Sequence, residues 1–186
     1  DERIDKTLHE LKIINKFLGG ISTSKSALKY FAEFENDELK IFDVGSGSSD
    51  NLLAAKSKYP KLKILSIDKN LRALSGSENL LEKINSNAFK LPFKNNSCDI
   101  IHTALFLHHF TEEELQLLLM EFLRTARKGI IINDLQRSYL ALIGIKILTV
   151  LFSKSEMVKN DAPLSVKRGF TKQEILKLLK DVGATN

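Results

Sequence analysis

The sequence predicts an α/β domain built around a doubly wound, mostly parallel sheet. Its apolar runs are short and nearly continuous rather than alternating, as in strands that are buried on both faces. Segments with apolar residues at three- and four-residue steps, the helical period, separate these runs. The 186 residues, 43% of them hydrophobic, suffice for one such domain with a substantial core.

Five apolar runs are the predicted strands, and the third is the weakest. They lie at residues 39–44, 62–67, 83–88, 99–105 and 129–134. Because helical segments alternate with these runs, consecutive strands are expected to be parallel and to be joined by helices on either face of the sheet.

Helices are predicted before, between and after the strands. Two precede the first strand, on either side of Gly19 and Gly20. Thr111 and Thr171 each begin a capping box, which predicts a helix directly after each of them. The remaining predicted helices lie at residues 50–59, through Leu80, Leu81 and Ile84, and in the nearly all-apolar stretch 139–152.

Charge and cysteine content exclude several classes of protein. The 28 Lys and Arg residues exceed the 23 Asp and Glu residues by five but form no block, so no nucleic-acid partner is expected. The single cysteine, Cys98, rules out an internal disulfide and a Cys-based zinc cage and is expected to be a buried thiol. No metal site is expected. The first residues hold no apolar signal segment, so the chain is expected to be cytoplasmic.

The residues directly after the strands are the candidates for a binding site, because parallel sheets bind ligands at the carboxyl ends of their strands. Asp43 near the end of the first strand is followed by Gly45, Ser46 and Gly47, and the glycines let a ligand approach the backbone closely. Asp68 follows the second strand, where an acidic residue can accept both hydroxyls of a ribose. A ribose-bearing cofactor is therefore predicted.

The kind of cofactor follows from departures from the dinucleotide-binding pattern. That pattern needs a third glycine at position 50, where this sequence has Asp50. A carboxylate at a helix start disfavours a pyrophosphate, which would occupy the same electropositive end. Asp43 likewise suits a cofactor that carries an ammonium and a sulfonium. An NAD-linked oxidoreductase is therefore the less favoured alternative.

Four segments, in this order and spacing, resemble the class I S-adenosylmethionine-dependent methyltransferases. They are similar to the small-molecule type that includes ubiquinone and menaquinone biosynthesis enzymes. The resemblance implies a Rossmann-like fold, S-adenosylmethionine as cofactor, and methyl transfer to an O, N or C atom of a small molecule, with a lipophilic one left open. The segments are residues 41–47, 67–68, 87–101 and 107–109, and the resemblance covers residues 38–134.

The resemblance also implies which residues hold the cofactor. The acid and glycines of the first strand end would hold its methionine part, Asp68 its ribose, and the residues after the third strand its adenine. The family usually has Asp where this sequence has Asn87. The implied cofactor-binding residues are Asp43, Gly45, Ser46, Gly47, Asp68, Lys69, Asn87, Ala88 and Thr103.

His108 and His109 are the candidate catalytic residues. They follow the fourth strand, near the place where a methyl acceptor should approach. A neutral imidazole can take a proton from a hydroxyl, so either could be a general base, or both could line the pocket without titrating. His9 and His102 are expected to be structural.

The resemblance divides the single domain of residues 1–186 into four parts. These are an N-terminal helical cap (1–37), a cofactor-binding core (38–134), a substrate-side insertion (135–170) and a last helix (171–186). The apolar helix of the insertion could pack in the core, line a lipophilic pocket or rest on a membrane surface. Core packing is favoured, and peripheral membrane contact is the less favoured reading.

Three further expectations concern a candidate phosphate-binding loop, the C-terminal hairpin of the family, and whether the protein is an enzyme. Residues 19–26 nearly match a phosphate-binding loop, but Ser24 stands where its second glycine belongs, so they are expected to link two helices. The family's C-terminal antiparallel hairpin is expected to be absent, which would leave a sheet edge open to a homodimer. A non-catalytic methyltransferase-like scaffold is the alternative to an enzyme.

Overall fold

The computed structural model describes residues 20–31, 38–47, 49–75, 81–153 and 155–184. Its centre is a five-stranded, all-parallel sheet with the order β3-β2-β1-β4-β5. The strands are β1 (Lys40–Val44), β2 (Lys63–Asp68), β3 (Glu82–Asn85), β4 (Cys98–Ala104) and β5 (Ala126–Asn133). The strand order turns back between β1 and β4, which is where ligands bind in such sheets.

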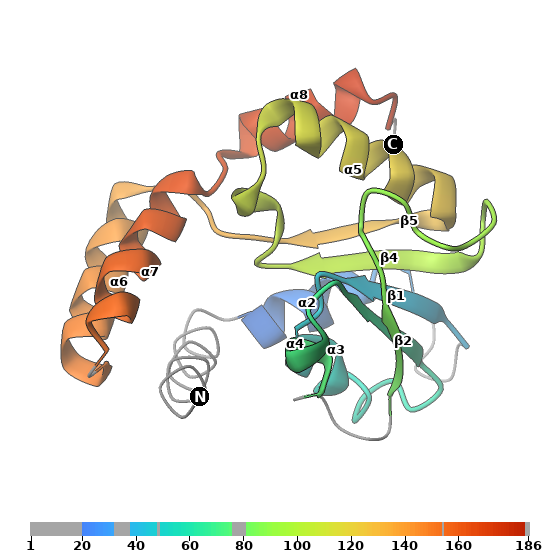
Figure 1. The fold of residues 1–186 in the computed structure, drawn as a ribbon, viewed down its shortest axis with the longest axis horizontal. Helices are drawn as coiled ribbons and strands as arrows, with labels where there is room; N and C mark the ends of the chain where they lie inside the picture. Colours follow the sequence, from blue (N-terminus) through green and yellow to red (C-terminus); the bar gives the residue numbers. More distant parts are fainter. Residues whose placement is uncertain (1–19, 32–37, 48, 76–80, 154, 185–186) are drawn as a thin grey trace.

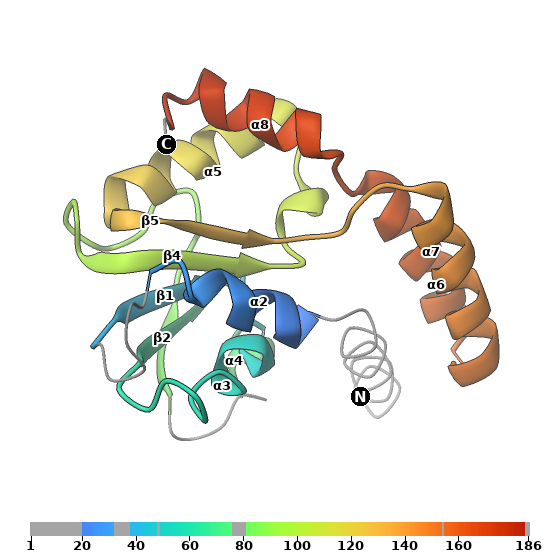
Figure 2. The ribbon, with the colours of Figure 1, turned by 180° about the vertical axis from the view of Figure 1, so that it is seen from behind.

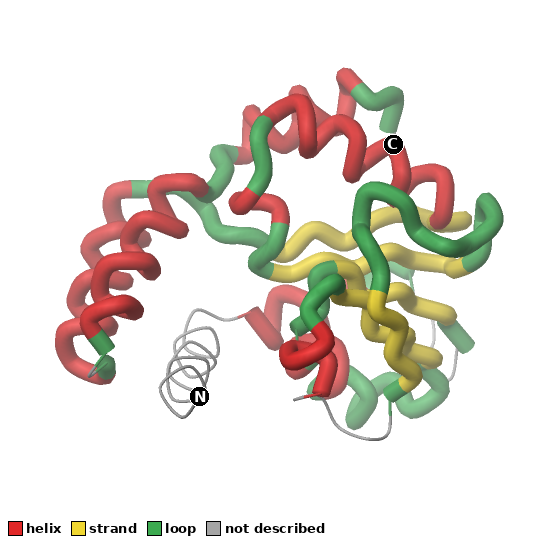
Figure 3. The backbone as a smooth tube through the Cα atoms, viewed as in Figure 1, coloured by secondary structure: helices red, strands yellow, loops and turns green. Residues whose placement is uncertain are grey.

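Helices cover both faces of the sheet, as Figures 1, 2 and 3 show. Helices α5 (Glu112–Thr125) and α8 (Lys172–Asp181) lie on one face, and α2 (Gly20–Leu28) and α3 (Asp50–Leu53) lie on the other, with α4 (Leu71–Ser75) beside α3. Both predicted capping boxes are present, at Thr111 and Thr171. The predicted α/β, doubly wound fold is confirmed.

Two apolar layers explain why the strand sequences are apolar without alternation. Neighbouring residues of a strand point to opposite faces, and in β1 the side chain of Ile41 packs with α2 and α3 while that of Phe42 packs with α5 and α8. In β4, Ile100 and Ile101 divide between the two layers in the same way. Strands β1 and β4 therefore need apolar residues on both sides.

Helices α6 (Tyr139–Phe152) and α7 (Glu156–Arg168) form an antiparallel pair that stands off the carboxyl end of β5 (Figures 1 and 2). The bounds of α6 agree with the prediction. Its inner face packs on α7 through Ile145, Val158, Ala162 and Val166. A broad outer face stays exposed, with Tyr139, Leu140, Ile143, Ile147, Val150 and Leu151. Helix α6 thus packs on α7, in a cluster separate from the two apolar layers of the sheet, and among the described residues it does not pack under the N-terminal helix α2, as core packing was predicted. No described helix has the length and apolar character that crossing a membrane requires.

Several predicted helices differ from the structure. Residues 20–28 are helix α2 rather than a link, and the helix predicted before Gly19 lies outside the described residues. Helix α3 ends at Leu53, and turns follow it. Ile84 lies in β3, where it pairs in register with Ile67, and not in a helix. Strand pairing here outweighs the local apolar period, as tertiary contacts often do.

Two further elements were not predicted as they stand. Asn87 and Ala88 lie in turns after β3, which ends at Asn85. Helix α7 was not predicted separately from α6. The signal for it was Ser155, whose side chain accepts from the Val158 backbone N–H, followed by Glu156 in the first turn.

Candidate functional site

The first strand end forms a tight turn that β2 holds in place. The backbone N–H groups of Gly45 and Ser46 both donate to the Ile67 carbonyl oxygen, at 2.9 and 3.3 Å. Gly45 and Gly47 have φ of 68° and 51°, in the left-handed region that favours glycine. The Gly47 N–H donates to Asp68 Oδ2 at 3.0 Å. The two predicted cofactor-binding segments are therefore joined directly.

An aromatic ring covers the first glycine of this turn. A Cβ atom on Gly45 would lie 2.2 Å from Phe106 Cδ2, so only glycine fits beneath the ring. Phe106 in turn stacks edge-on against Phe110, whose ring meets Phe89 in the same way. By contrast, a Cβ on Gly47 would meet no atom within 4 Å. The Phe106 ring therefore covers Gly45, whereas the described residues leave space beside Gly47.

Two buried hydroxyl oxygens at this edge have no hydrogen-bond partner among the residues that the structure describes. They are Ser46 Oγ, in the turn, and Thr103 Oγ1, near the end of β4. Buried polar atoms are nearly always hydrogen-bonded in proteins, so such exceptions ask for an explanation. Both belong to the predicted cofactor-binding residues, and a polar ligand beside them would satisfy them.

The acid at the end of β2 is held by the backbone around it. Asp68 is half-buried, and its Oδ1 accepts from the Asn70 N–H at 2.8 Å while Oδ2 accepts from Gly47. Each carboxylate oxygen can accept a second hydrogen bond, so Asp68 keeps capacity for hydroxyl donors. Lys69, predicted beside it, is exposed.

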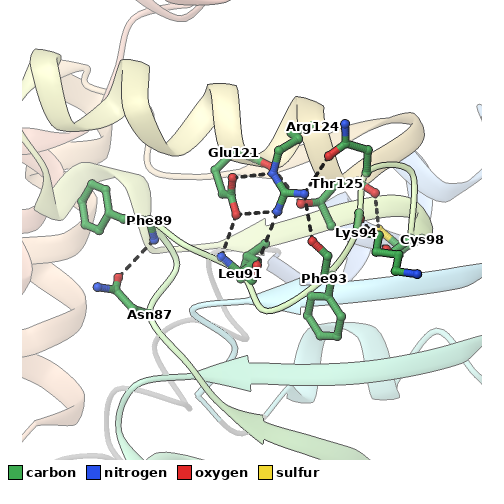
Figure 4. A network of polar contacts seen from close by, with 11 residues as sticks. Asn87, Phe89, Leu91, Phe93, Lys94, Cys98, Glu121, Arg124 and Thr125 are labelled. Atoms are coloured by element: carbon green, nitrogen blue, oxygen red, sulfur yellow. Dashed lines mark hydrogen bonds and ion pairs between the residues drawn. The ribbon is translucent and has the colours of Figure 1, made fainter.

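The loop that carries Asn87 and Ala88 is fixed by a charged clamp on α5 (Figure 4). Glu121 Oε1 accepts from the Leu91 N–H at 2.6 Å, and Arg124 donates to the Phe93 carbonyl oxygen at 2.8 Å. The hydrogen bond from Arg124 lowers the pKa of Glu121. Asn87 itself is exposed, and its Oδ1 accepts from the Phe89 N–H at 3.1 Å. Its amide oxygen is thus partly used, while none of the described residues accepts a hydrogen bond from its NH₂ group.

Asp43 lies near the carboxyl end of β1, and its side chain belongs to a buried polar network. Its Oδ1 is 2.7 Å from Nδ1 of His102, and the two side chains are 3% and 0% exposed. His102 Nε2 is 2.8 Å from Ser24 Oγ in α2. Asn133 Nδ2 donates to the same oxygen at 2.9 Å. His102 therefore contacts a predicted site residue, which the structural reading of the sequence did not foresee.

The histidine pair follows β4 in the short 3₁₀-helix η1 (Leu107–His109). His108 is buried, and its Nδ1 is 2.6 Å from Asp134 Oδ1. Asp134 Oδ2 accepts from the N–H groups of Phe106 and Leu107, at 3.1 and 2.8 Å. One carboxylate therefore fixes both the backbone of η1 and the ring of His108.

His109 differs from its neighbour in exposure. It is exposed, and its ring centroid lies 4.1 Å from that of His108. Partial burial, the neighbouring His108 and the positive charge of Arg168 in α7 lower the pKa of His109, against the opposing charge of Asp134. His109 is consequently neutral near pH 7.

Cys98 takes no part in this edge. It lies at the opposite end of β4 from the histidines, is buried as predicted, and donates weakly to the Thr125 carbonyl oxygen at 3.6 Å. Burial raises the pKa of its thiol to about 12. A thiol with such a pKa is no nucleophile near neutral pH.

The central residues of the chain are similar to a known protein family. Residues 42–132 match the model of a family described as "Methyltransferase domain". This match, over 91 of the 186 residues, agrees with the resemblance of the sequence to the class I methyltransferases. Enzymes of this class take their methyl group from S-adenosylmethionine. No curated protein sequence matches the chain.

Solved methyltransferase structures share the fold. The plantazolicin methyltransferase BpumL in complex with SAH has a TM-score of 0.74 at 17% identity, over 98% of this chain and 70% of that one. BamL, in complex with a triazolic desmethylPZN analog and SAH, has a TM-score of 0.73 at 20% identity, over 98% and 68%. A SAM-dependent methyltransferase from Aquifex aeolicus has 0.60 at 19%, over 86% and 78%. The chain spans between 50% and 78% of the lengths of these and the other solved relatives.

One cavity of the protein lies at the base of the α6–α7 pair, away from the predicted cofactor residues. Its volume is about 480 Å³, and its lining is mostly apolar. It is lined by Arg137, Ser138, Tyr139, Leu142, Val166 and Lys167. In the part of the chain that the structure describes, no three His, Cys, Asp or Glu side chains are grouped as a metal site would require.

Sequence reasoning missed the side chains that support the site. Phe106, which covers Gly45, was not among the predicted site residues, and Asp134 was considered only for contact with an acceptor and not as the residue that holds His108. The available signal was position: both lie directly after strands whose carboxyl ends meet at the site. Arg137, which follows β5, is paired with Glu174 of α8.

Proposed function

We propose that this methyltransferase binds S-adenosylmethionine at the carboxyl ends of β1, β2 and β4 and transfers its methyl group to a small molecule. The observation that carries the proposal is the presence at this edge of Ser46 and Thr103, each with a buried hydroxyl oxygen that has no hydrogen-bond partner among the described residues. Two carboxylates, Asp43 and Asp68, lie at the same edge.

The residues present fit the cofactor part by part. Asp43 would accept from the ammonium of the methionine part, beside the open turn at Gly47. Asp68 would accept from the ribose hydroxyls, and the Asn87 NH₂ would donate to the adenine beside Ala88. When bound, S-adenosylmethionine supplies an electrophilic methyl group on a positively charged sulfur. Carboxylates favour such a cation, whereas they would repel the pyrophosphate of NAD.

His108 is the better candidate for a general base. Asp134 fixes the proton on Nδ1, which leaves the Nε2 lone pair as the acceptor. Among the described residues, none is hydrogen-bonded to His108 Nε2. His109 lies beside His108 and is exposed, but no carboxylate of the described residues is hydrogen-bonded to its ring. A hydroxyl acceptor would therefore lose its proton to His108 as the methyl group transfers.

Cofactor binding is tested by calorimetric titration of the purified chain with S-adenosylhomocysteine, with NAD as the control ligand. We expect micromolar binding of S-adenosylhomocysteine alone. Asp68→Ala should weaken it by about 1–3 kcal/mol, the usual effect of removing a polar contact, and Asp43→Ala should also weaken it. A cooperatively folded chain that binds neither ligand would support the non-catalytic scaffold instead.

The roles of the two histidines separate once a methyl-accepting compound has been found with methyl-labelled S-adenosylmethionine. For a hydroxyl acceptor, His108→Ala should lower kcat by about 10²- to 10⁴-fold, the contribution of a general base. His109→Ala should lower it much less. Equal effects of the two substitutions would mean that the pair only shapes the pocket.

A further inference from the structure

We propose that His102 is a positioning residue, which holds the carboxylate of Asp43 in its ionised form and aims the free oxygen at the cofactor. This inference rests on the proposed function, because it takes Asp43 as the residue that meets the cofactor's ammonium. It assigns a function to a side chain that lies wholly inside the protein and cannot itself touch a ligand.

The sheet register places His102 beside Asp43. The two residues are direct partners in the parallel pairing of β1 with β4, and Ser66 is the partner of Asp43 on β2. On the same face, one step toward the start of these strands, the positions are filled by Ile41 and Ile100. The polar row therefore begins where the apolar layer ends, directly before the turn at Gly45.

Hydrogen-bond partners assign the proton of the imidazole. Asn133 Nδ2 donates to Ser24 Oγ, so the Ser24 hydroxyl hydrogen is available to His102 Nε2. Nε2 is then an acceptor, and Nδ1 carries the proton that Asp43 Oδ1 accepts. A doubly protonated ring would leave the Ser24 hydroxyl hydrogen without an acceptor among the described residues. The network thus pairs a neutral histidine with an ionised Asp43.

That arrangement leaves one carboxylate oxygen for a ligand. None of the described residues is hydrogen-bonded to Asp43 Oδ2. An ionised carboxylate that is 97% buried is costly unless charge-assisted hydrogen bonds stabilise it. His102 provides one such bond without cancelling the negative charge, and the cofactor's ammonium would provide the other.

A polar network that served only to stabilise the fold would not need the buried charge of Asp43. Ser24 and Asn133 already tie α2 to β5, since Asn133 Nδ2 also donates to the Gly20 carbonyl oxygen at 2.8 Å. An apolar pair at positions 43 and 102 would extend the isoleucine layer without burying a charge. The charge is therefore best explained by what it meets at the strand end.

Two near-isosteric substitutions separate the two hydrogen bonds of His102. Asparagine places its NH₂ where Nδ1 lies and keeps the bond to Asp43, whereas glutamine reaches the place of Nε2 and keeps the bond to Ser24. Calorimetric titration with S-adenosylhomocysteine should give a Kd for His102→Asn within about threefold of the unchanged chain. His102→Gln should raise Kd tenfold or more, as expected for losing a hydrogen bond to a charged group. Ser24→Ala, which removes only the link to α2, should behave like His102→Asn.

The outcomes distinguish this inference from the function on which it rests. If the unchanged chain does not bind S-adenosylhomocysteine, the proposed function fails and the inference fails with it. If the unchanged chain binds, but the asparagine and glutamine variants lose affinity equally and in step with their thermal stability, His102 is structural only.

A spectroscopic measurement on the unchanged chain covers the case in which the glutamine variant does not fold. A hydrogen-bonded imidazole N–H gives a resolved downfield proton resonance, identified here by its loss in His102→Asn. Saturation with S-adenosylhomocysteine should shift the His102 resonance, because the ammonium draws charge from the Asp43 carboxylate. An unchanged resonance in the saturated protein would overturn the proposal.

Discussion

Gly45→Ala should destabilise the chain by about 3 kcal/mol, from two added costs. The left-handed backbone at φ 68° costs a side-chain-bearing residue about 1–2 kcal/mol. The new methyl group would also lie 2.2 to 2.7 Å from three ring atoms of Phe106, where overpacking typically adds 1–3 kcal/mol. For a chain of this length, such a loss lowers Tm by about 10 °C, which differential scanning calorimetry measures.

Gly47→Ala is the matched control for this prediction. Its φ of 51° imposes the same backbone cost, but its Cβ would enter open space. The substitution should therefore cost only about 1–2 kcal/mol of stability. Gly45→Ala should cost less stability when it is added to Phe106→Ala than when it is added to the unchanged chain, because the clash with the ring is then absent. Equal Tm values for Gly45→Ala and Gly47→Ala would contradict a closed contact between Phe106 and the turn.

The parts of the fold that local signals encode could be predicted from the sequence. The capping boxes at Thr111 and Thr171 act within four residues, so the starts of α5 and α8 were predicted correctly. The third strand was predicted at residues 83–88 and is present as β3 (Glu82–Asn85), but its carboxyl end was misplaced because that end depends on pairing with β2 and not on its own four residues. Its Ile84 fits either a helical or a strand pattern by itself.

Some features of the candidate site could likewise be predicted from the sequence, and others could not. The predicted cofactor residues gather at one edge because every strand of a parallel sheet ends there, which follows from topology alone. The contacts that shape the site join residues far apart in the chain, such as Asp43 with His102, 59 positions away, or His108 with Asp134, 26 positions away. No local pattern in the sequence encodes such pairs, so the contact between His102 and Asp43 was not predicted.

Asp134→Ala should cost about 3 kcal/mol of stability and release η1 from the end of β5. The carboxylate accepts from three backbone N–H groups, those of Phe106, Leu107 and Leu135, and from the His108 ring. Its side chain is only 4% exposed, so water replaces these acceptors poorly. Each buried donor left without a partner costs about 1–3 kcal/mol. Urea unfolding, together with hydrogen exchange of the Phe106 and Leu107 amides, measures both effects.

His108→Ala separates the two functions of this carboxylate. It removes the imidazole but leaves Asp134 with its three backbone donors, so the amides of Phe106 and Leu107 should stay protected from exchange. The predicted base is removed in His108→Ala and loses its orienting carboxylate in Asp134→Ala, whereas the backbone of η1 is released only in Asp134→Ala. Because Phe106 begins this segment and covers Gly45, release of η1 should also loosen the turn that faces the cofactor. Asp134→Ala should therefore weaken binding of S-adenosylhomocysteine more than His108→Ala does. Equal protection of the amides in both variants would mean that Asp134 orients only the histidine.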